Sequence, residues 1–268
     1  MSSQADVAEN LNQAERLLRR ASELGAQICV LPEAFAFLGN EQERARHAEA
    51  FSSRRALPRG RVHEALSRFA QQGNFWLVAG GAIEQSSDPA RPYNTSLVMD
   101  PHGKVRERYR KIHLFDVVLA GGTSYQESSA TSPGDRVVVA EALGHKVGLS
   151  ICYDLRFPML FAQQRLQGAE ILTVPAAFTA KTGQAHWELL LRARAVETQC
   201  FVIAAAQVGS HPLGRRTFGH AMVVDGWGSK LAECNGETPG LAVAELDFAA
   251  QARVRQDMPL AASERDAL

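Results

Sequence analysis

One segment of the sequence occurs twice, once in each half of the chain, and this repeat restricts the possible folds more than any other pattern does. Residues 28–35 read ICVLPEAF and residues 171–178 read ILTVPAAF. A glycine that would end a helix, Gly25 or Gly168, precedes each copy. The apolar run that opens each copy has no alternation, which is typical of a β-strand covered on both faces. The chain is therefore expected to contain the same structural unit twice.

The residues around each copy predict the rest of the unit. Residues 7–24 carry apolar side chains at steps of three and four, which predicts a helix with one buried face. The other elements predicted for the first half are a strand at 28–31, a helix at 61–72, a strand at 75–79 and a hairpin at 95–99 and 105–109. The corresponding strand and hairpin of the second half are predicted at 201–206 and 222–231.

Two copies of a unit that runs helix, strand, helix, strand, hairpin most simply form two packed sheets with helices outside, an α/β architecture. No low-complexity linker separates the copies, so residues 1–268 are predicted to form a single domain. One predicted strand of the second half, residues 146–152, has no counterpart in the first half. The repeat places the corresponding strand before residue 7, where only MSSQAD stands. The first unit is expected either to have lost this strand or to start upstream.

Composition and charge exclude several classes of function. Lys and Arg number 29 and Asp and Glu number 29, so no overall field attracts nucleic acid or an anionic membrane. The N-terminus has no basic segment followed by an apolar one, and no apolar run approaches the length of a membrane span. The four cysteines form no CxxC pair, which fits neither a disulfide framework nor a zinc finger. These features predict a cytoplasmic protein that binds neither nucleic acid nor a membrane.

The repeat singles out Glu33, because Ala176 occupies the same place in the second copy. A carboxylate that follows a buried strand stands where α/β sheets deliver side chains to a binding site. A glutamate that caps a helix or lies on the surface explains the position equally well.

Cys152 ends a second apolar run, residues 147–151, and a turn follows it. A nucleophile at such a place exposes its sulfur while the next backbone N–H points at the same substrate oxygen. A free cysteine is more often a small buried apolar residue, and that interpretation is adopted for Cys29 and Cys200. Alone among the four cysteines, Cys152 combines a strand end with a nearby arginine, Arg156.

Three further polar residues near residue 120 have ordinary explanations when each is taken alone. Lys111 follows the predicted hairpin, and a lysine at a strand edge is usually solvated. His113 is interpreted as a packed or hydrogen-bonded histidine, and Glu127 as a loop acid.

Taken together, the segments around Glu33, Lys111 and Cys152 resemble a known family. LPEAF (31–35), YRKIHLFD (109–116) and GLSICYDLRFP (148–158) are similar to the Glu, Lys and Cys motifs of the nitrilase, or carbon-nitrogen hydrolase, superfamily, in the same order. Residues 182–200 and 219–228 extend the resemblance over nearly the whole chain, and their wording is most similar to the branch that hydrolyses deaminated glutathione. The ω-amidase branch is next.

The resemblance implies a four-layer α-β-β-α sandwich with an internal pseudo-two-fold repeat, a homodimer, and hydrolysis of a small amide through a thioester without metal or cofactor. It implies that Cys152 attacks the carbonyl while Lys111 and the backbone N–H of Tyr153 bind the oxyanion. Glu33 would accept the thiol proton, pass it to the departing amine and then activate water. Glu127 matches a second family glutamate that positions Lys111 or the substrate.

Other residues are candidates for the walls of the pocket. Arg156 is interpreted as a clamp on a 2-oxo acid carboxylate, with an ion pair to Asp154 as the alternative. Phe178 and Thr179 are expected to form an adjacent wall. The basic loop HPLGRR at 211–216 is a candidate for the far carboxylate of a peptide-like substrate, but a solvated loop is the preferred interpretation.

Four other functions are considered for this sequence. An ω-amidase acting on 2-oxoglutaramate, or an enzyme for another amide or carbamoyl substrate, would use the same three residues. A non-catalytic interaction scaffold is disfavoured because all three are present. A nucleotide-binding protein is disfavoured because neither GxGxxG after the first strand nor GxxxxGK[ST] occurs, and a metallohydrolase because the eight histidines have no ligand-like spacing.

Overall fold

The computed structural model of the protein describes residues 1–51, 60–118 and 124–260. The helices in these ranges are α1 (Val7–Glu23), α2 (Arg61–Gly73), α3 (Pro158–Leu166), α4 (Ala180–Thr198) and α5 (Phe248–Asp257), with 3-10 segments η1 (Glu41–His47), η2 (Glu127–Ser129), η3 (Cys152–Arg156) and η4 (Pro212–Gly214). One sheet contains β1 (Ile28–Leu31), β2 (Trp76–Glu84), β3 (Tyr93–Met99) and β4 (Val105–Arg110). A second sheet contains, in spatial order, β14 (Lys230–Glu233), β13 (Met222–Val224), β10 (Phe201–Ala204), β9 (Ile171–Thr173), β8 (His145–Leu149) and β7 (Val139–Ala142). Two short hairpins are β5 (Asp116–Val118) with β6 (Ser124–Gln126), and β11 (Val208–Ser210) with β12 (Arg216–Phe218).

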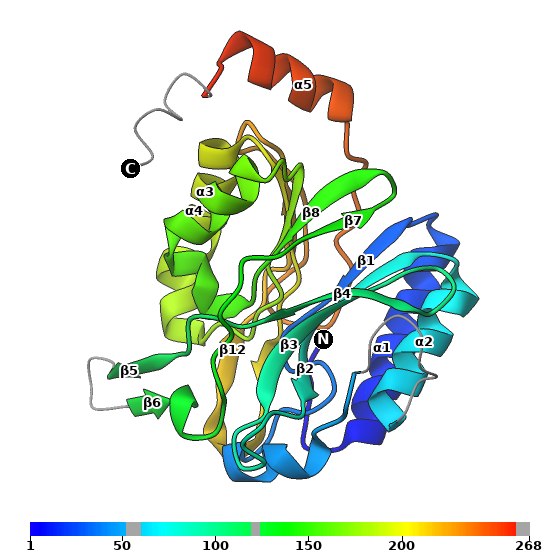
Figure 1. The fold of residues 1–268 in the computed structure, drawn as a ribbon, viewed down its shortest axis with the longest axis vertical. Coiled ribbons are helices and arrows are strands. Elements are labelled where there is room, and N and C mark those ends of the chain that lie inside the picture. The colour runs from blue at the N-terminus through cyan, green and yellow to red at the C-terminus, as the bar shows by residue number, and fades with distance from the viewer. Residues whose placement is uncertain (52–59, 119–123, 261–268) are drawn as a thin grey trace.

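The two sheets lie face to face between two pairs of helices (Figure 1). Helices α1 and α2 cover the outer face of the first sheet, and α3 and α4 cover the second (Figure 1). Between the sheets, Val78, Val98 and Tyr109 of the first sheet share one apolar cluster with the strands of the second. The predicted four-layer α-β-β-α sandwich is confirmed. No helix in the described ranges has the length and apolar character needed to cross a membrane.

Helix α1 shows how the local sequence produces these layers. The carboxylate of Asp6 accepts hydrogen bonds from the first free N–H groups of the helix, at Ala8 and Glu9. The side chains of Leu11, Ala14, Leu18 and Ala21 fall on one face and are buried. This face packs with α2 and the outer face of the first sheet in a second apolar cluster.

The strand pairings confirm the internal repeat. In each half, the first two strands of the unit are parallel and the next two follow antiparallel, so that β1-β2-β3-β4 corresponds to β9-β10-β13-β14. The second half extends its sheet by β8, parallel to β9, and by β7, antiparallel to β8. Both strands that precede the repeated loops are short: β1 ends at Leu31 and β9 ends at Thr173.

The strand that the repeat predicts beside β1 is not found among the described residues. Residues 1–5 form no strand, and the carbonyl of Met1 instead accepts a hydrogen bond from the N–H of Val208. A cleft of about 730 Å³ lies along β1, lined by apolar residues of β1, β10 and β13 and by residues 240–246. Residues 241–246, LAVAEL, are similar in sequence to residues 138–143, VVAEAL, around β7, but they form no strand. The place that β8 occupies in the second half is therefore open in the first.

Candidate active site

Glu33 lies two residues beyond β1, in a turn that projects between the sheets. The backbone of Ala34 has a positive φ of 57°, and Gly81 of β2 passes close to this turn. A Cβ atom at Gly81 would lie 2.4 Å from the nitrogen of Ala34, so this position requires glycine. The carboxylate of Glu33 is buried, and it accepts hydrogen bonds from the N–H of Ala177 at 2.9 Å and from Lys111 Nζ at 2.9 Å.

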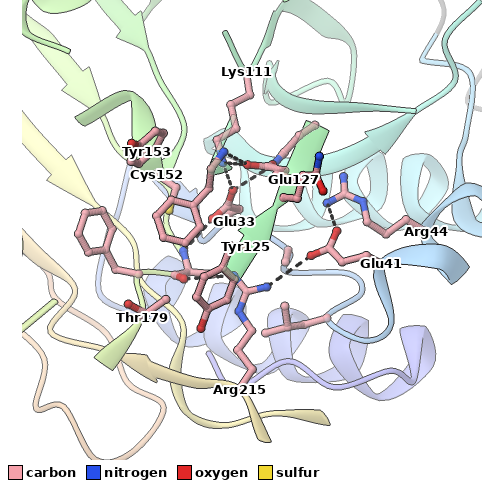
Figure 2. Close-up of a pocket in the computed structure, with 18 of the residues that line it drawn as sticks. Glu33, Glu41, Arg44, Lys111, Tyr125, Glu127, Cys152, Tyr153, Thr179 and Arg215 are labelled. Carbon is pink, nitrogen blue, oxygen red and sulfur yellow. Dashed lines mark hydrogen bonds and ion pairs between the residues drawn. The ribbon is translucent and has the colours of Figure 1, made fainter. Parts of the chain in front are cut away.

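Lys111 follows β4 directly and is almost completely buried, with an exposed fraction of 2%. Its Nζ lies between two carboxylates, 2.9 Å from Glu33 Oε1 and 2.8 Å from Glu127 Oε2 (Figure 2). Glu127 is oriented in turn by the backbone N–H of Phe115, which donates to Oε2 at 2.8 Å. The structure thus brings Glu127 into contact with Lys111, where the resemblance places it.

Asn94 of β3 joins the same network, and the sequence analysis missed it. Its amide Nδ2 donates to Glu33 Oε1 at 3.0 Å and to Glu127 Oε1 at 3.2 Å. Asn94 is buried, so these two carboxylates share one donor as well as one ammonium. Nothing in the strand sequence YNTSLVM distinguishes an inward-facing asparagine from an ordinary strand residue.

Cys152 is held in a strained turn at the start of η3. Its φ is +50°, a backbone conformation that few non-glycine residues adopt. The N–H of Cys152 donates to the carbonyl of Pro175 at 2.8 Å, in the second copy of the repeated loop. The buried Asp154 fixes the turn, because its carboxylate accepts hydrogen bonds from the N–H of Ile151 and the hydroxyl of Tyr109. The turn thereby places Cys152 in the same pocket as Glu33, close enough that the charge of Glu33 affects the pKa of the thiol.

The buried charges determine which groups carry protons at rest. Burial alone would lower the pKa of Lys111, but Glu127 and Glu33 raise it above its ordinary value, so Lys111 is an ammonium. Burial acts to raise the pKa of Glu33, but Lys111 outweighs it and holds this pKa below its ordinary value. Burial and then the charge of Glu33 raise the pKa of the Cys152 thiol well above its usual range, although Lys111 acts in the opposite direction. The resting site therefore holds a carboxylate, an ammonium and a neutral thiol.

A pocket of about 280 Å³ opens onto these residues. Phe178 and Thr179, the two residues predicted to form a wall, line it, and so do Tyr153 and Arg156. The guanidinium of Arg156 lies 5.3 Å from the ring centroid of Phe178 and within 3.4 Å of the imidazole of His186. Within the described ranges Arg156 forms no ion pair with Asp154, so this alternative is wrong.

The loop predicted to be solvated, residues 211–216, is solvated only in part: Leu213 is 81% exposed, but two of its basic residues are not on the open surface. His211 is buried and hydrogen-bonded to the carbonyl of Ser3, and the side chain of Arg215 lines the pocket. Arg215 meets Glu41 of η1 at 3.7 Å, and Glu41 lies 3.8 Å from Arg44 (Figure 2). Glu41 and Arg44 belong to a run of charged residues, which sequence alone would place on a solvated surface.

The two cysteines and the histidine that were interpreted as packed residues are found in that state. Cys29 and Cys200 are buried, and His113 is stacked on Phe157 with its Nδ1 2.8 Å from Asp154 Oδ1. In the part of the chain that the structure describes, no group of three or more histidine, cysteine, aspartate or glutamate side chains is arranged to hold a metal ion.

Comparison with known proteins identifies the family of the chain. The sequence profile of the carbon-nitrogen hydrolase family matches residues 1–256. A deaminated glutathione amidase from Synechocystis is 43% identical to the chain over 97% of its length and 93% of the relative's. The crystal structure of the Caenorhabditis elegans NitFhit protein superposes with a TM-score of 0.88 at 38% identity, over 98% of this chain and 62% of that one.

A more distant structure adds a chemical observation. The structure of a mutant amidase from Nesterenkonia, with a TM-score of 0.77 and 26% identity over 100% of this chain and 96% of that chain, shows the result of Michael addition of acrylamide at the active-site cysteine. The match of the profile to nearly the whole chain, together with identities of about 40% to full-length relatives, is decisive for the family. The protein belongs to the carbon-nitrogen hydrolase family of the nitrilase superfamily.

Proposed function

We propose that the protein hydrolyses deaminated glutathione to 2-oxoglutarate and cysteinylglycine, with Glu33, Lys111 and Cys152 as catalytic residues. In this substrate the amine of the γ-glutamyl group has been replaced by a keto group. The similarity to deaminated glutathione amidases supports the choice of substrate. The observation that carries the chemistry is the contact of Lys111 with two carboxylates beside the thiol of Cys152.

The first half of the reaction forms a thioester. Glu33 accepts the proton of Cys152, and the sulfur forms a bond to the amide carbon. Lys111 and the backbone N–H of Tyr153 stabilise the oxyanion, and loss of one such donor typically costs about 3 to 4 kcal/mol of transition-state stabilisation. As the tetrahedral intermediate collapses, the C–N bond breaks and Glu33 gives its proton to the departing nitrogen, which leaves as the free amine of cysteinylglycine.

The second half hydrolyses the thioester. Glu33, again a carboxylate, accepts a proton from water as the water oxygen attacks the acyl carbon, and the same two donors hold the new oxyanion. The C–S bond breaks, the proton returns from Glu33 to sulfur, and 2-oxoglutarate leaves. One water is consumed and the three residues return to their starting protonation states.

The pKa shifts support a proton transfer that accompanies attack on the carbonyl. Because the pKa of Glu33 is held below its ordinary value and that of Cys152 above it, the free enzyme keeps the proton on sulfur. A substrate oxygen that gains negative charge next to Lys111 balances the charge that leaves the sulfur. The thiolate is therefore formed only when an electrophile is present.

The test of this proposal is direct release of product. The purified protein is mixed with deaminated glutathione, 2-oxoglutarate is followed by a coupled assay, and Cys152→Ala is run beside Cys234→Ala, which removes a thiol outside the pocket. We expect turnover by the wild type and by Cys234→Ala and none by Cys152→Ala. Equal turnover by all three would show that the nucleophile is wrong, and turnover of 2-oxoglutaramate alone would favour the ω-amidase function.

We also propose that the protein is a homodimer that buries the outer face of α3 and α4. Both helices expose large apolar side chains, with Met159 at 63%, Leu166 at 53%, Leu189 at 66% and Val196 at 43%. Large apolar side chains exposed on two neighbouring helices favour an interaction surface there. Light scattering of the wild type should give the mass of two chains, whereas the Leu189→Arg variant should have the mass of one chain.

A cytoplasmic location is part of the same proposal. All four cysteines are free thiols, which suits a reducing compartment. Fractionation of cells that produce the protein should place it with the cytoplasmic markers.

A further inference from the structure

A group of three charged side chains lines the pocket and takes no part in the bond-making steps of the proposed reaction. Arg44 and Glu41 come from η1, and Arg215 comes from the turn between β11 and β12. Glu41 lies between the two guanidinium groups (Figure 2). All three side chains line the same pocket as Cys152.

The two arginines have donor atoms to spare. The Nε atoms of Arg44 and Arg215 are both buried, and neither has a hydrogen-bond partner among the described residues. Their separations from Glu41, 3.8 and 3.7 Å, exceed an ordinary charge-assisted hydrogen bond. Arg215 also donates to the carbonyl of Ala177, but at a long 3.4 Å. A buried N–H group that lacks a partner is costly, and a bound anion would supply one.

The charges of the group point to the kind of anion. Two arginines and one glutamate leave a single net positive charge, which one carboxylate would neutralise. The planar guanidinium groups suit a carboxylate, whose two oxygens can accept two hydrogen bonds at once. Glu41 itself shows that a carboxylate fits beside both arginines, and with its side chain 46% exposed it is free to move aside.

We propose that Arg44 and Arg215 form a carboxylate-binding subsite that holds the glycine carboxylate of the leaving group. This inference rests on the proposed function, because it takes deaminated glutathione as the substrate. Arg156 lines the pocket separately, on the side of Tyr153 and Phe178, and is left to bind the 2-oxo acid carboxylate. The long leaving group extends toward the partly exposed rim, where Glu41 and Arg215 lie.

This subsite selects amides with a carboxylate on each side of the bond that is cut. Deaminated glutathione has both. 2-Oxoglutaramate has only the carboxylate on the acyl side, so it leaves Arg44 and Arg215 with Glu41 as their sole anionic partner in the site. The subsite thus separates a deaminated glutathione amidase from an ω-amidase that carries the same three catalytic residues.

The test compares Arg215→Gln with Arg216→Gln on three substrates. Arg216 is the neighbouring arginine, is exposed and does not line the pocket, so the two variants lose the same charge one residue apart. The substrates are deaminated glutathione, its analogue with a carboxamide in place of the glycine carboxylate, and 2-oxoglutaramate. For Arg215→Gln we expect KM for deaminated glutathione to rise at least tenfold with little change in kcat, and kcat/KM for the other two to stay within twofold of the wild type. Arg216→Gln should resemble the wild type on all three.

Glu41→Gln provides a second variant with the opposite expected effect. Because Glu41 competes with the substrate for the two arginines, its neutralisation should lower KM for deaminated glutathione and leave the carboxamide analogue unaffected. The subsite would be overturned if Arg215→Gln lowered kcat/KM equally for all three substrates. It would also be overturned if KM rose as much for the carboxamide analogue as for deaminated glutathione.

A binding measurement separates failure of the subsite from failure of the proposed function. Calorimetry on Cys152→Ala, with and without Arg215→Gln, measures the affinity for intact deaminated glutathione without turnover. If Arg215→Gln weakens binding tenfold but the wild type does not hydrolyse deaminated glutathione, the subsite is kept and the proposed reaction is rejected. Turnover by the wild type with affinity independent of Arg215 would keep the reaction and reject the subsite.

Discussion

The carboxylate of Glu33 accepts a hydrogen bond from the backbone N–H of Ala177, at 2.9 Å, across the interface between the two halves of the fold. Ala177 occupies the place in the second repeat that Ala34, the neighbour of Glu33, occupies in the first. The carboxylate that only the first copy carries is therefore held by the backbone of the second copy. The proposed base and the proposed nucleophile meet only when the two sheets are packed.

Glu33→Gln should abolish most activity while the protein remains folded. The amide oxygen of glutamine can still accept the hydrogen bond from Ala177, but the group can no longer accept the thiol proton. We expect kcat to fall by roughly 10²- to 10⁴-fold, the usual contribution of a general base. Stopped-time assays of 2-oxoglutarate release measure the loss, and a circular dichroism melt checks the fold. A variant that kept more than a tenth of wild-type kcat would remove Glu33 from the mechanism.

Asn94→Asp should reduce activity and make it depend on pH. The substitution keeps the shape of the side chain but replaces a donor to Glu33 and Glu127 by a third carboxylate near Lys111. Loss of hydrogen bonds to charged groups costs roughly 1.5 to 3 kcal/mol, about a 10- to 100-fold fall in kcat/KM.

The pH profile tells this positioning role from mere damage to the fold. The crowded carboxylates of Asn94→Asp should share a proton as the pH falls, so its relative activity should recover between pH 7 and pH 5. Asn94→Ser, which adds no charge, serves as the control and should show no such recovery.

Protein stability should fall as the pH drops from 7 to 5, in part through His211. Burial lowers the pKa of His211, with Arg215 and the chain terminus acting in the same direction and the Ser3 carbonyl opposing them. Below about pH 6.5, the ordinary histidine value, the unfolded chain takes up a proton that the folded chain refuses, so the lower pH favours unfolding.

Urea titrations at several pH values measure this effect. His211→Gln should flatten the dependence of the unfolding free energy on pH, whereas His102→Gln, at an exposed position, should leave it unchanged. Part of the slope should survive in His211→Gln, because burial also lowers the pKa of His63. Stability that rose on acidification in this range would contradict the prediction.

Glu84→Gln should destabilise the first sheet. Glu84 is buried on β2, with an exposed fraction of 3%, and it binds Arg108 and Arg110 of β4 at 2.9 Å and the hydroxyl of Thr95 at 2.8 Å. Removal of one member of a fully buried ion pair costs about 3 to 5 kcal/mol, and because both arginines are about a third exposed we expect roughly 2 kcal/mol.

A surface pair provides the matched control for Glu84. Glu23 pairs with Arg20 at 3.0 Å, but both side chains are more than half exposed. Glu23→Gln should therefore change the unfolding free energy by less than about 0.5 kcal/mol. Denaturant midpoints measured side by side decide the matter, and equal effects of the two substitutions would contradict the assigned role of Glu84.

The sequence was informative where a local pattern carries the structural reason for a residue. Glu33 and Cys152 each follow a buried apolar strand, so the pattern that predicts the strand also places the side chain at its end. The repeat predicted the order of four paired strands in each half, because the same apolar runs and turns recur in both. Pro175 in one loop and Pro32 in the other end these strands early, which is why β9 stops at Thr173 and the following residues form the pocket wall.

The remaining site residues depend on contacts that are distant in sequence. Asn94 is one polar residue in an ordinary strand, and its partners come from two other segments. Arg215 and Arg216 are adjacent arginines, yet only Arg215 lines the pocket. Arg216 is paired with Ser210 in the β11–β12 hairpin, and Arg215 lies in the turn just before that pair. Which of two neighbouring arginines faces a site is decided by the tertiary packing of the hairpin.

Because of the open cleft along β1, we expect the backbone hydrogen bonds of β1 to break more often than those of β9, the corresponding strand of the second half. Strand β9 is hydrogen-bonded on both sides, to β8 and β10, whereas β1 pairs within the described residues with β2 alone. Amide protons of β1 should therefore exchange with deuterium faster than those of β9, since a strand with one free edge can separate with fewer bonds broken. Glu33 stands two residues beyond that looser strand, while the loop of Cys152 is bonded to the more protected sheet. Fluctuations of β1 would move the proposed base, Glu33, relative to the proposed nucleophile, Cys152.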